Sequence, residues 1–324
     1  PPQKMKDEIM ANFDSLLTEY PSGMKVKSLL AAKNYNVKQE NILVGNGTEE
    51  LTKALFGYLQ ERTGFVGTAV DNYLWLKDKN EAVDFTSYKD NYSYSVDDLI
   101  CFCIENKINR LILINPDNGN YLSKTDLLRL IGWAKENDIK ILIDETFADF
   151  ADETDNSLLD QDILTSNCNL YVIKDIALSH GVPGLRLGML ASGDVESIEL
   201  IKKSIPMWNI NSFGEFFMQI EEKYKKDYDD SLKKIRLERS RLQKEVSAIN
   251  GLKVIPSQTN FLVIELEREI KPKELLKKLL VKHDLFFRES IMKREEKNYM
   301  RFAVRSAEDN NKLISALRGE LSHS

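Results

Sequence analysis

The sequence predicts an α/β fold built on a mostly parallel β-sheet, followed by a smaller α+β unit. Up to residue 191, apolar runs of strand length alternate with helical segments. These runs are apolar on both faces, as in parallel sheets, whose strands are covered by helices on both sides. Beyond residue 250 strands and helices alternate over shorter spans, which indicates a second, smaller unit.

The N-terminal part predicts two helices, a strand and a third helix. Residues 4–18 place apolar side chains at helical spacing, and this pattern ends at a PSG turn. A second helix carries Val26, Leu29 and Leu30. The apolar run NILVG then passes through a glycine turn into a helix whose first turn begins at Thr48.

Six more apolar runs complete the predicted large sheet. Between residues 211 and 248 almost no turn signal occurs, and the charged tract within this stretch is typical of the solvated face of a long helix. We therefore expect a large domain over residues 25–240 and a small domain formed by residues 1–24 and 241–324. The six runs are FVGTAV, AVDFT, RLILIN, KILIDE, NLYVIK and RLGMLA, and the small domain has candidate strands LKVIP, NFLVIEL, LFFRE and MRFAV with helices over 271–282 and 306–319.

The composition disfavours several classes of protein. The 324 residues are 42% hydrophobic and 30% charged with a net charge of -6, which is typical of a folded chain. Acidic and basic residues are mixed, without the basic stripe that neutralises nucleic-acid phosphates. No apolar stretch approaches the ~20 residues that span a bilayer, and the N-terminus is unlike a signal peptide. The three cysteines and three histidines give no zinc spacing. We expect a cytoplasmic protein without metal, nucleic-acid or membrane partners.

Several segments place charge-binding groups beside predicted strand ends. The turn from Gly45 to Thr48 leads into a helix N-terminus, whose free amides and dipole favour a phosphate. Asp144 ends the strand KILID. Arg186 and Arg301 carry guanidinium groups, which bind phosphate or carboxylate through two hydrogen bonds. Taken singly, these features are also explained as a plain turn, a strand-end cap and surface arginines.

Taken together, four segments resemble the class I/II aminotransferases, which have the type-I fold of enzymes that use pyridoxal phosphate. The closest resemblance is to the branch that contains histidinol-phosphate aminotransferase and threonine-phosphate decarboxylase, and it extends over almost the whole chain. It implies a large domain with a mostly parallel seven-stranded sheet covered by helices, and a smaller α+β domain. The four segments are VGNGTEEL, INPDNGNYLS, ILIDETFADF and HGVPGLRLGML.

The resemblance assigns roles around the cofactor. Gly47 and Thr48 correspond to the turn that holds the cofactor phosphate, and Arg186 to the arginine that clamps it. Asp144 corresponds to the residue that pairs with the protonated pyridine nitrogen and keeps the ring an electron sink. The implied cofactor is pyridoxal 5'-phosphate or pyridoxamine 5'-phosphate.

Further positions concern the ring and the substrate. Asn118 resembles the asparagine that reaches the phenolic oxygen of the cofactor, and Phe147 stands where many relatives have a tyrosine for the same oxygen. The aromatic residue that stacks on the ring is Tyr73 in one alignment, and in another Val70 occupies its place. Arg301, in YMRFAV, matches the arginine that binds a substrate carboxylate.

The resemblance also implies a homodimer with its sites at the interface and a small amino-acid-type ligand. Tyr20, in EYPSG, resembles a tyrosine that reaches the cofactor phosphate of the neighbouring subunit. Asn209 lies in WNINSF, which resembles a segment on the substrate side.

The main departure from the family is at Leu178. In relatives a lysine stands five residues before the proline of the PGLR motif, binds the cofactor covalently as a Schiff base and shuttles a proton. Counting back from Pro183 gives Leu178, preceded by Ala177 where serine is expected. Leucine has no amine, so we expect the cofactor to bind non-covalently if at all. Lys174, four residues upstream on the strand, is a poor substitute.

Other features depart in the same direction. The turn NPDNGNYLS is shorter than the NPNNPTG turn of relatives, and the chain begins close to the first family helix, so we expect the preceding arm to be short or missing. Because several site features differ together, natural repurposing is favoured over a deliberate substitution of one lysine.

The sequence leaves four functions to compare. The first is a catalytically impaired or repurposed aminotransferase relative with a residual pocket for the cofactor or an amino-acid phosphate. The second is a transaminase of amino acids or of phosphorylated or phosphonate substrates, either deliberately inactivated or part of a larger enzyme. The third is a dinucleotide-dependent oxidoreductase, but GNGTEE is not the GxGxxG fingerprint. The fourth is a purely structural interaction protein.

Overall fold

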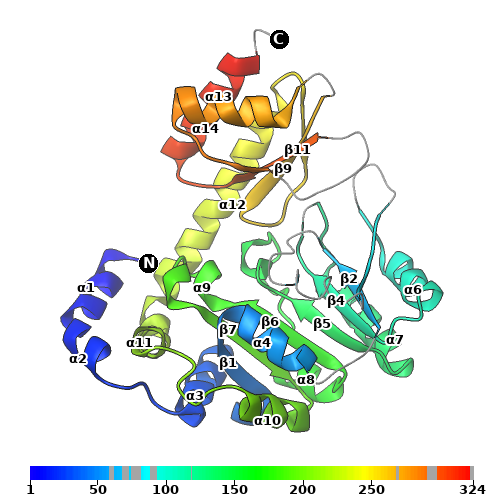
Figure 1. Cartoon of the computed structure of the whole chain (residues 1–324), viewed down its shortest axis with the longest axis vertical. Coiled ribbons are helices and arrows are strands. Elements are labelled where there is room, and N and C mark those ends of the chain that lie inside the picture. The colour runs from blue at the N-terminus through cyan, green and yellow to red at the C-terminus, as the bar shows by residue number, and fades with distance from the viewer. Residues whose placement is uncertain are drawn as a thin grey trace.

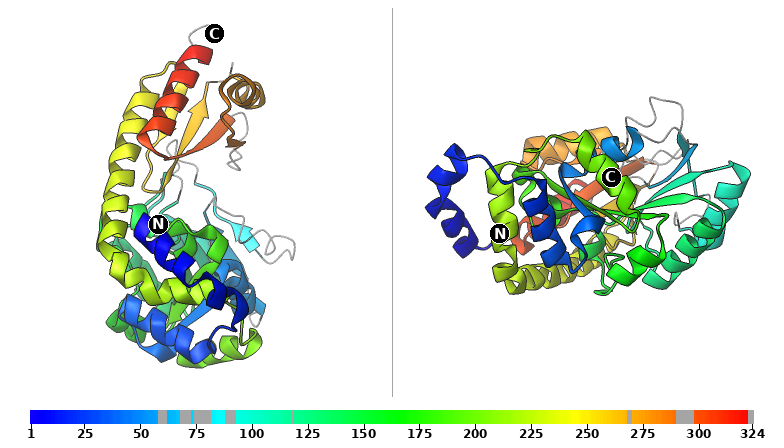
Figure 2. Two further views of the ribbon diagram at one scale, coloured as in Figure 1. Left: turned by 90° about the vertical axis from the view of Figure 1, so that its left-hand side faces the viewer. Right: turned by 90° about the horizontal axis from the view of Figure 1, so that it is seen from below.

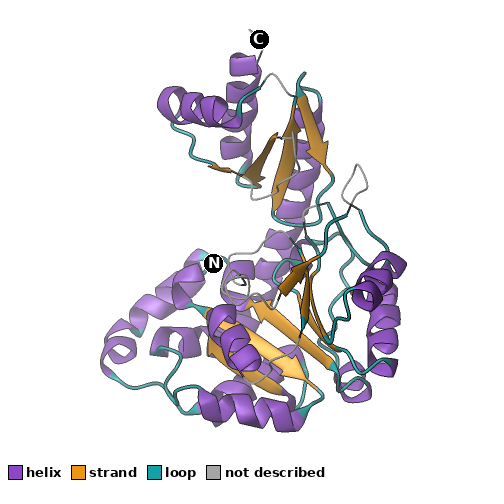
Figure 3. Cartoon of the chain, turned by 45° about the vertical axis from the view of Figure 1, so that its right-hand side comes forward, coloured by secondary structure: helices purple, strands orange, loops and turns teal. Residues whose placement is uncertain are grey.

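Two β-sheets organise the chain. The computed structural model describes residues 1–57, 62–67, 73, 82–87, 93–117, 119–267, 270–289 and 298–321. A seven-stranded sheet forms the core of a large domain and a four-stranded sheet the core of a smaller one (Figures 1 and 3). The long helix α12 runs along one side of the molecule from one domain to the other, as Figure 2 shows.

The large sheet is mostly parallel, which confirms the predicted fold class. Its strand order is β1-β7-β6-β5-β4-β2-β3, and only β7 is antiparallel to its neighbours. All seven apolar runs read from the sequence form strands here. They are β1 (Ile42–Asn46), β2 (Thr63–Val66), β3 (Ala82–Asp84), β4 (Arg110–Ile114), β5 (Lys140–Asp144), β6 (Leu170–Asp175) and β7 (Leu187–Ser192).

The strand directions bring several loops to one edge of this sheet. Because β7 runs opposite to the others, its first residues lie beside the last residues of its neighbours. Asn46 at the end of β1 pairs with Leu187, and Asp175 at the end of β6 pairs with Gly188. Asp144 ends β5 at the same edge, since β5 and β6 are parallel. The segments that precede β7 and follow β1, β5 and β6 therefore meet.

Helices cover both faces of the sheet. Alternate residues of β1 point into two separate core clusters, Ile42 and Val44 into one and Leu43 into the other, so the strand is buried on both faces as predicted. None of the helices that the structure describes has the length and apolar character needed to cross a membrane. The helices of this part are α1 (Gln3–Ala11), α2 (Phe13–Thr18), α3 (Met24–Tyr35), α4 (Gly47–Gly57), α6 (Val96–Glu105), α7 (Lys124–Glu136), α8 (Gln161–Ser166), α9 (Ile176–Ser179), α10 (Val195–Ser204), α11 (Ser212–Ile220) and α12 (Lys225–Ser247), with 3₁₀ helices η1 (Gln39–Asn41), η3 (Ala148–Phe150), η4 (Pro183–Leu185) and η5 (Glu221–Tyr224).

Local capping explains where several helices begin. Ser95 precedes α6, its hydroxyl accepts from the amide of Asp98, and the Asp98 carboxylate accepts from the amide of Ser95. This reciprocal pair satisfies two amides that a helix N-terminus otherwise leaves unpaired. Asn211 caps α11 in a similar way through the amide of Gly214.

Two helical stretches are interrupted where the sequence predicted continuous helix. The stretch 4–18 breaks at Asn12, whose ψ of 10° is not helical, into α1 and α2. The stretch 211–248 changes to a 3₁₀ turn at η5 before α12 begins. The N-terminal helices pack on α11, where Phe13 meets Phe213 edge-on with ring centroids 5.7 Å apart. The domain limits 25–240, 1–24 and 241–324 stay a prediction.

The small domain is an antiparallel sheet packed against α13, α14 and the C-terminal part of α12, and its four strands and the helices α13 and α14 lie where the sequence predicted them. The strand order is β10-β11-β9-β8, and its own apolar cluster includes Leu262, Leu279 and Leu317. The elements are β8 (Leu252–Ile255), β9 (Phe261–Leu266), β10 (Arg288–Glu289), β11 (Asn298–Ala303), α13 (Pro272–His283) and α14 (Ala307–Leu321).

Arg239 of α12 connects the two domains. Its side chain is buried, and Nη1 donates to the carbonyl oxygens of Phe150 and Thr259 at 2.6 and 3.0 Å. Nη2 donates to Asp152 at 2.6 Å. Phe150 belongs to the large domain, whereas Thr259 precedes β9. A single guanidinium thus satisfies buried acceptors from both domains.

We expect Arg239→Leu to lower the free energy of unfolding by about 2–4 kcal/mol, because two carbonyl oxygens would lose their donor. The control is Arg318→Ala, which removes an exposed ion pair with Glu245 and should cost about 0.5 kcal/mol or less. Urea unfolding followed by circular dichroism measures both. Equal effects of the two variants would contradict the linking role of Arg239.

Candidate functional site

The turn between β1 and α4 forms a cradle with Arg186. Gly47 has a φ of +76°, and a Cβ atom there would lie 3.1 Å from Arg186 Nη2. A Cβ atom at Gly188 would lie 2.6 Å from the amide nitrogen of Thr48. Only glycine allows both contacts, so the guanidinium and β7 lie directly against the first turn of α4.

The cradle has the chemistry of a phosphate site. The Arg186 side chain is 55% exposed, and the contacts of Nη2 with the described residues are long, 3.5 Å to the carbonyl oxygen of Asn46 and 3.9 Å to Glu49. Its donors therefore stay available beside the N-terminus of α4. Helix N-terminal amides and a guanidinium are a common pair for holding a dianionic phosphate.

Asp144 is a buried carboxylate with two donors. It is 3% exposed, its Oδ2 accepts from the Tyr73 hydroxyl at 2.8 Å, and its Oδ1 accepts from the Thr146 amide at 2.9 Å. Burial raises the pKa of Asp144, although the hydrogen bonds from Thr146 and Tyr73 act in the opposite direction. Each oxygen can accept one more hydrogen bond. A cationic N–H donor would therefore find a matching partner here.

Tyr73 supports Asp144 through its hydroxyl. The ring is buried and lies against Phe65 with centroids 5.4 Å apart. The sequence did not indicate this contact with Asp144, and the stacking of Tyr73 on a cofactor ring stays a prediction. Val70, the alternative, lies outside the described residues, as does Asn118.

Leu178 lies at the same sheet edge, on the short helix α9 that follows β6. The Asp175 carboxylate caps this helix by accepting from the Leu178 amide at 2.9 Å, and the leucine side chain packs on the apolar cluster of that face. Lys174 is buried on β6 with Nζ 2.5 Å from Asp149 Oδ1. Its ammonium group is therefore already paired.

Phe147 and Arg301 both contact the ring of Phe261. Phe147 is buried and contacts the edge of the Phe261 ring at a centroid distance of 5.3 Å. The Arg301 guanidinium lies 3.6 Å from the centroid of the same ring, a favourable cation–π geometry. The small domain thus places Arg301 close to the segment that follows Asp144.

Asn209 lies beside the turn between β1 and α4, since the Glu50 oxygen to which it donates also accepts from the Asn46 amide at 2.7 Å, whereas Tyr20 lies on the surface. The Asn209 amide nitrogen donates to the carbonyl oxygen of Val44 at 3.1 Å and to Glu50 at 2.8 Å, so it anchors its loop to β1. Tyr20 is 80% exposed and its ring lies 4.6 Å from that of Trp208. Substrate contact by Asn209 and contact of Tyr20 with a second subunit stay predictions.

A polar cluster beneath α9 was not indicated by the sequence. The two oxygens of Asp149 accept from Lys174 and from the Tyr228 hydroxyl, the latter at 2.6 Å. Burial alone would raise the pKa of Asp149, but Lys174 and Tyr228 together lower it. The His180 ring stacks on Tyr228 with centroids 4.0 Å apart. These residues come from segments far apart in sequence, so no local pattern could have identified them.

The comparison with known proteins agrees with this geometry. The model of the family "Aminotransferase class I and II" matches residues 24–317. The chain belongs to this family. Its members depend on pyridoxal phosphate, and among the residues that the structure describes no cluster is arranged to hold a metal ion.

Two curated relatives are similar over almost the whole chain. An L-serine phosphate decarboxylase of Sulfurospirillum multivorans is 29% identical over 96% of this chain and 82% of its own length. A CMP-5'-(3-aminopropyl)phosphonate synthase of Streptomyces rubellomurinus is 26% identical over 98% of this chain, which spans only 50% of that protein.

Solved structures have the same fold. A decarboxylase from Sulfurospirillum multivorans has a TM-score of 0.88 at 27% identity, covering 99% of this chain and 86% of that one. A histidinol-phosphate aminotransferase from Sinorhizobium meliloti, in complex with pyridoxal-5'-phosphate, has a TM-score of 0.84 at 16% identity, covering 100% of this chain and 88% of that one.

The site residues fit the cofactor of the family. The cradle of Gly47, Thr48 and Arg186 suits its phosphate, and the buried Asp144 suits its protonated ring nitrogen. When bound, this cofactor supplies an electron sink. The residues themselves would hold its two ends.

We expect Gly47→Ala to weaken the binding of pyridoxamine phosphate by about tenfold or more, because alanine is strained at this φ and displaces Arg186. Gly23→Ala is the control, since no atom lies within 4 Å of a Cβ placed there. Isothermal titration calorimetry measures the affinities. Unchanged binding by the Gly47 variant would show that the phosphate is held elsewhere.

Proposed function

We propose that the protein binds pyridoxal 5'-phosphate or pyridoxamine 5'-phosphate non-covalently, alone or with an amino-acid phosphate, and that it is not a normal transaminase. One observation carries this proposal. The cradle and Asp144 retain the groups that bind the charged ends of the cofactor, whereas Leu178, with no amine, lies at the same sheet edge.

Different residues of the chain would bind the phosphate and the ring of the cofactor. Arg186 and the α4 amides would hold the phosphate, and Asp144, oriented by Tyr73, would keep the proton on the ring nitrogen. Phe147 offers no hydroxyl to the phenolic oxygen. Leu178 presents an apolar surface to the ligand, and Lys174 stays bound to Asp149.

The names of the relatives suggest the second ligand. The Sulfurospirillum relative acts on serine phosphate, so an amino acid with a phosphorylated side chain is the ligand class that we favour. Arg301 would pair with its carboxylate. We further propose a cytoplasmic homodimer in which Tyr20 reaches the cofactor phosphate of the second subunit.

We expect the purified protein, mixed with pyridoxal phosphate and desalted, to retain the absorbance of the cofactor without covalent attachment. Borohydride treatment should then leave the mass of the chain unchanged, since no lysine is linked to it. Arg186→Ala should lower the affinity by about tenfold or more, whereas the exposed control Arg305→Ala should not. Loss of all absorbance on desalting, with no heat of binding in calorimetry, would overturn the proposal.

The second candidate is a transaminase that forms one domain of a longer enzyme. It is favoured by the length of the Streptomyces synthase, of which this chain spans half. In that case the chemistry of the family would have to be recoverable at position 178.

We expect Ala177→Ser combined with Leu178→Lys to give yellow protein on addition of pyridoxal phosphate, because the new amine would lie where the family places its lysine. Ala177→Ser with Leu178→Met is the matched control, since methionine is of similar length and has no amine. Reduction should fix the cofactor to the introduced lysine in the first variant and to no residue in the control. A colourless first variant would contradict the assignment of position 178.

A further inference from the structure

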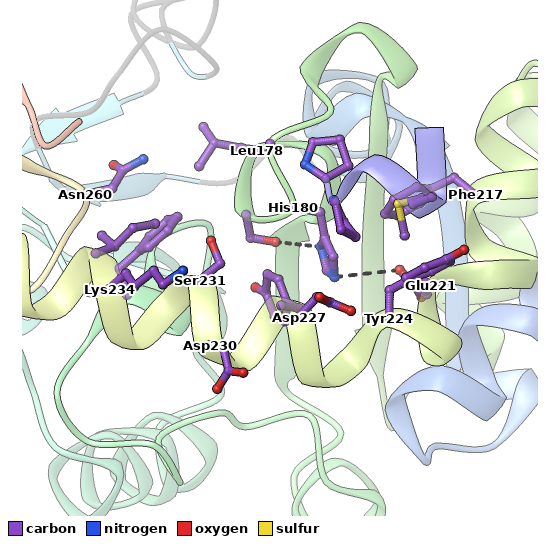
Figure 4. Close-up of a pocket in the computed structure, with 18 of the residues that line it drawn as sticks. Leu178, His180, Phe217, Glu221, Tyr224, Asp227, Asp230, Ser231, Lys234 and Asn260 are labelled. Atoms are coloured by element: carbon purple, nitrogen blue, oxygen red, sulfur yellow. Dashed lines mark hydrogen bonds and ion pairs between the residues drawn. The ribbon is translucent and has the colours of Figure 1, made fainter. Parts of the chain in front are cut away.

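A cavity of about 580 Å³ opens between α9, η5 and α12 and reaches the small domain at Asn260 (Figure 4). Leu178 contributes to one wall, and Pro1 and Pro2 also border it. The cradle residues and Asp144 are not among the described residues that line it. The cavity therefore adjoins the proposed cofactor site at Leu178 without including the groups proposed to hold the cofactor phosphate and ring nitrogen, and its size is that of pockets for small molecules.

Glu221 lines this cavity, and one oxygen of its buried carboxylate accepts no hydrogen bond from the described residues. The residue is 8% exposed, Oε1 accepts from the Asn34 side chain, and Oε2 has no hydrogen-bond partner in the described part of the chain. Burial raises the pKa of Glu221 to about 7, and the neighbouring carboxylate of Glu222 acts in the same direction. When Glu221 is ionised, this buried oxygen lacks a donor among the described residues, which is costly.

His180 cannot be that partner. Burial lowers the pKa of His180 to about 4, so the ring is neutral at pH 7. Nδ1 lies 3.0 Å from the carbonyl oxygen of Ile176, which only accepts, and 3.1 Å from the Ser179 hydroxyl, which itself donates to that carbonyl, so we assign the proton to Nδ1. Nε2 is then an acceptor, and it lies 3.8 Å from Glu221 Oε2. When Glu221 is ionised, two acceptors therefore face each other; when it is protonated, its own O–H can donate to Nε2.

An ammonium group would satisfy both acceptors. A nitrogen with several N–H donors can lie within about 3 Å of both atoms at this separation. The surroundings also suit an organic cation, because Tyr228 stacks on His180 and Phe217 meets its edge with centroids 5.5 Å apart. Aromatic rings beside a carboxylate recognise amines with an apolar body. Farther along α12, the cavity wall carries Asp227, Asp230 and Lys234, two acids and one base.

We propose that this cavity binds a small organic primary amine, whose ammonium group donates to Glu221 Oε2 and His180 Nε2. The apolar part of the amine packs against Tyr228 and Phe217. The proposal does not depend on the cofactor site.

The test compares phenethylamine with phenethyl alcohol, which has the same apolar body and no charge. Calorimetry on the protein without pyridoxal phosphate should show the amine binding at least about tenfold more tightly than the alcohol. Glu221→Gln should weaken the amine by about tenfold or more and leave the alcohol unchanged. Glu105→Gln, a change in an exposed acid of α6 that does not line the cavity, should affect neither.

Equal affinity for the two compounds, or undiminished amine binding by Glu221→Gln, would overturn the proposal. No binding of the amine would do the same, and would indicate that water occupies the space between the acceptors. The comparison of the two ligands on the unaltered protein decides the question even if Glu221→Gln does not fold. Since no cofactor is present, failure here is distinguishable from failure of cofactor binding.

Discussion

The close contact between β7 and the first turn of α4 is the constraint on which the candidate site depends. Gly188 has no side chain, so the Thr48 amide can lie where a Cβ atom would otherwise be. The reversed direction of β7 brings Arg186 to the same edge as the ends of β1, β5 and β6. A larger residue at Gly188 would push α4 away from the sheet, and the guanidinium would lose its place beside the helix N-terminus. The position of the Arg186 guanidinium therefore depends on the close backbone packing at Gly188.

Several buried charges in this protein are compensated by hydrogen bonds. Lys174 is paired with Asp149, which also accepts from Tyr228, and Arg239 is surrounded by three acceptors. In each case the hydrogen bonds offset the cost of removing the charge from water. Glu221 differs because one of its oxygens faces a neutral histidine and a cavity. Lys174 and Arg239 are paired within the protein and have structural roles, whereas the cavity-facing oxygen of Glu221 is the basis of the proposed binding site.

The proposed function combines groups suited to binding with a residue that has no reactive group. In this proposal Asp144 and the cradle would bind the charged ends of a phosphorylated pyridine. Leu178 lies in the first turn of α9, and the Asp175 carboxylate caps this helix by accepting from the Leu178 amide. The loss of function proposed here therefore concerns the chemistry of one side chain and leaves the architecture around it unaffected.

The sequence by itself determined the strands, the class of fold and the charged residues at the sheet edge, because apolar runs, glycine turns and strand-end motifs are local signals. The break at Asn12 was missed, since it depends on packing against α11. The bond between Tyr73 and Asp144 and the facing acceptors of His180 and Glu221 were missed for the same kind of reason. Those contacts join segments that are distant in the chain. Burial, which only the tertiary structure decides, shifts the pKa values of Asp144, His180 and Glu221 and determines which hydrogen-bond partners they need.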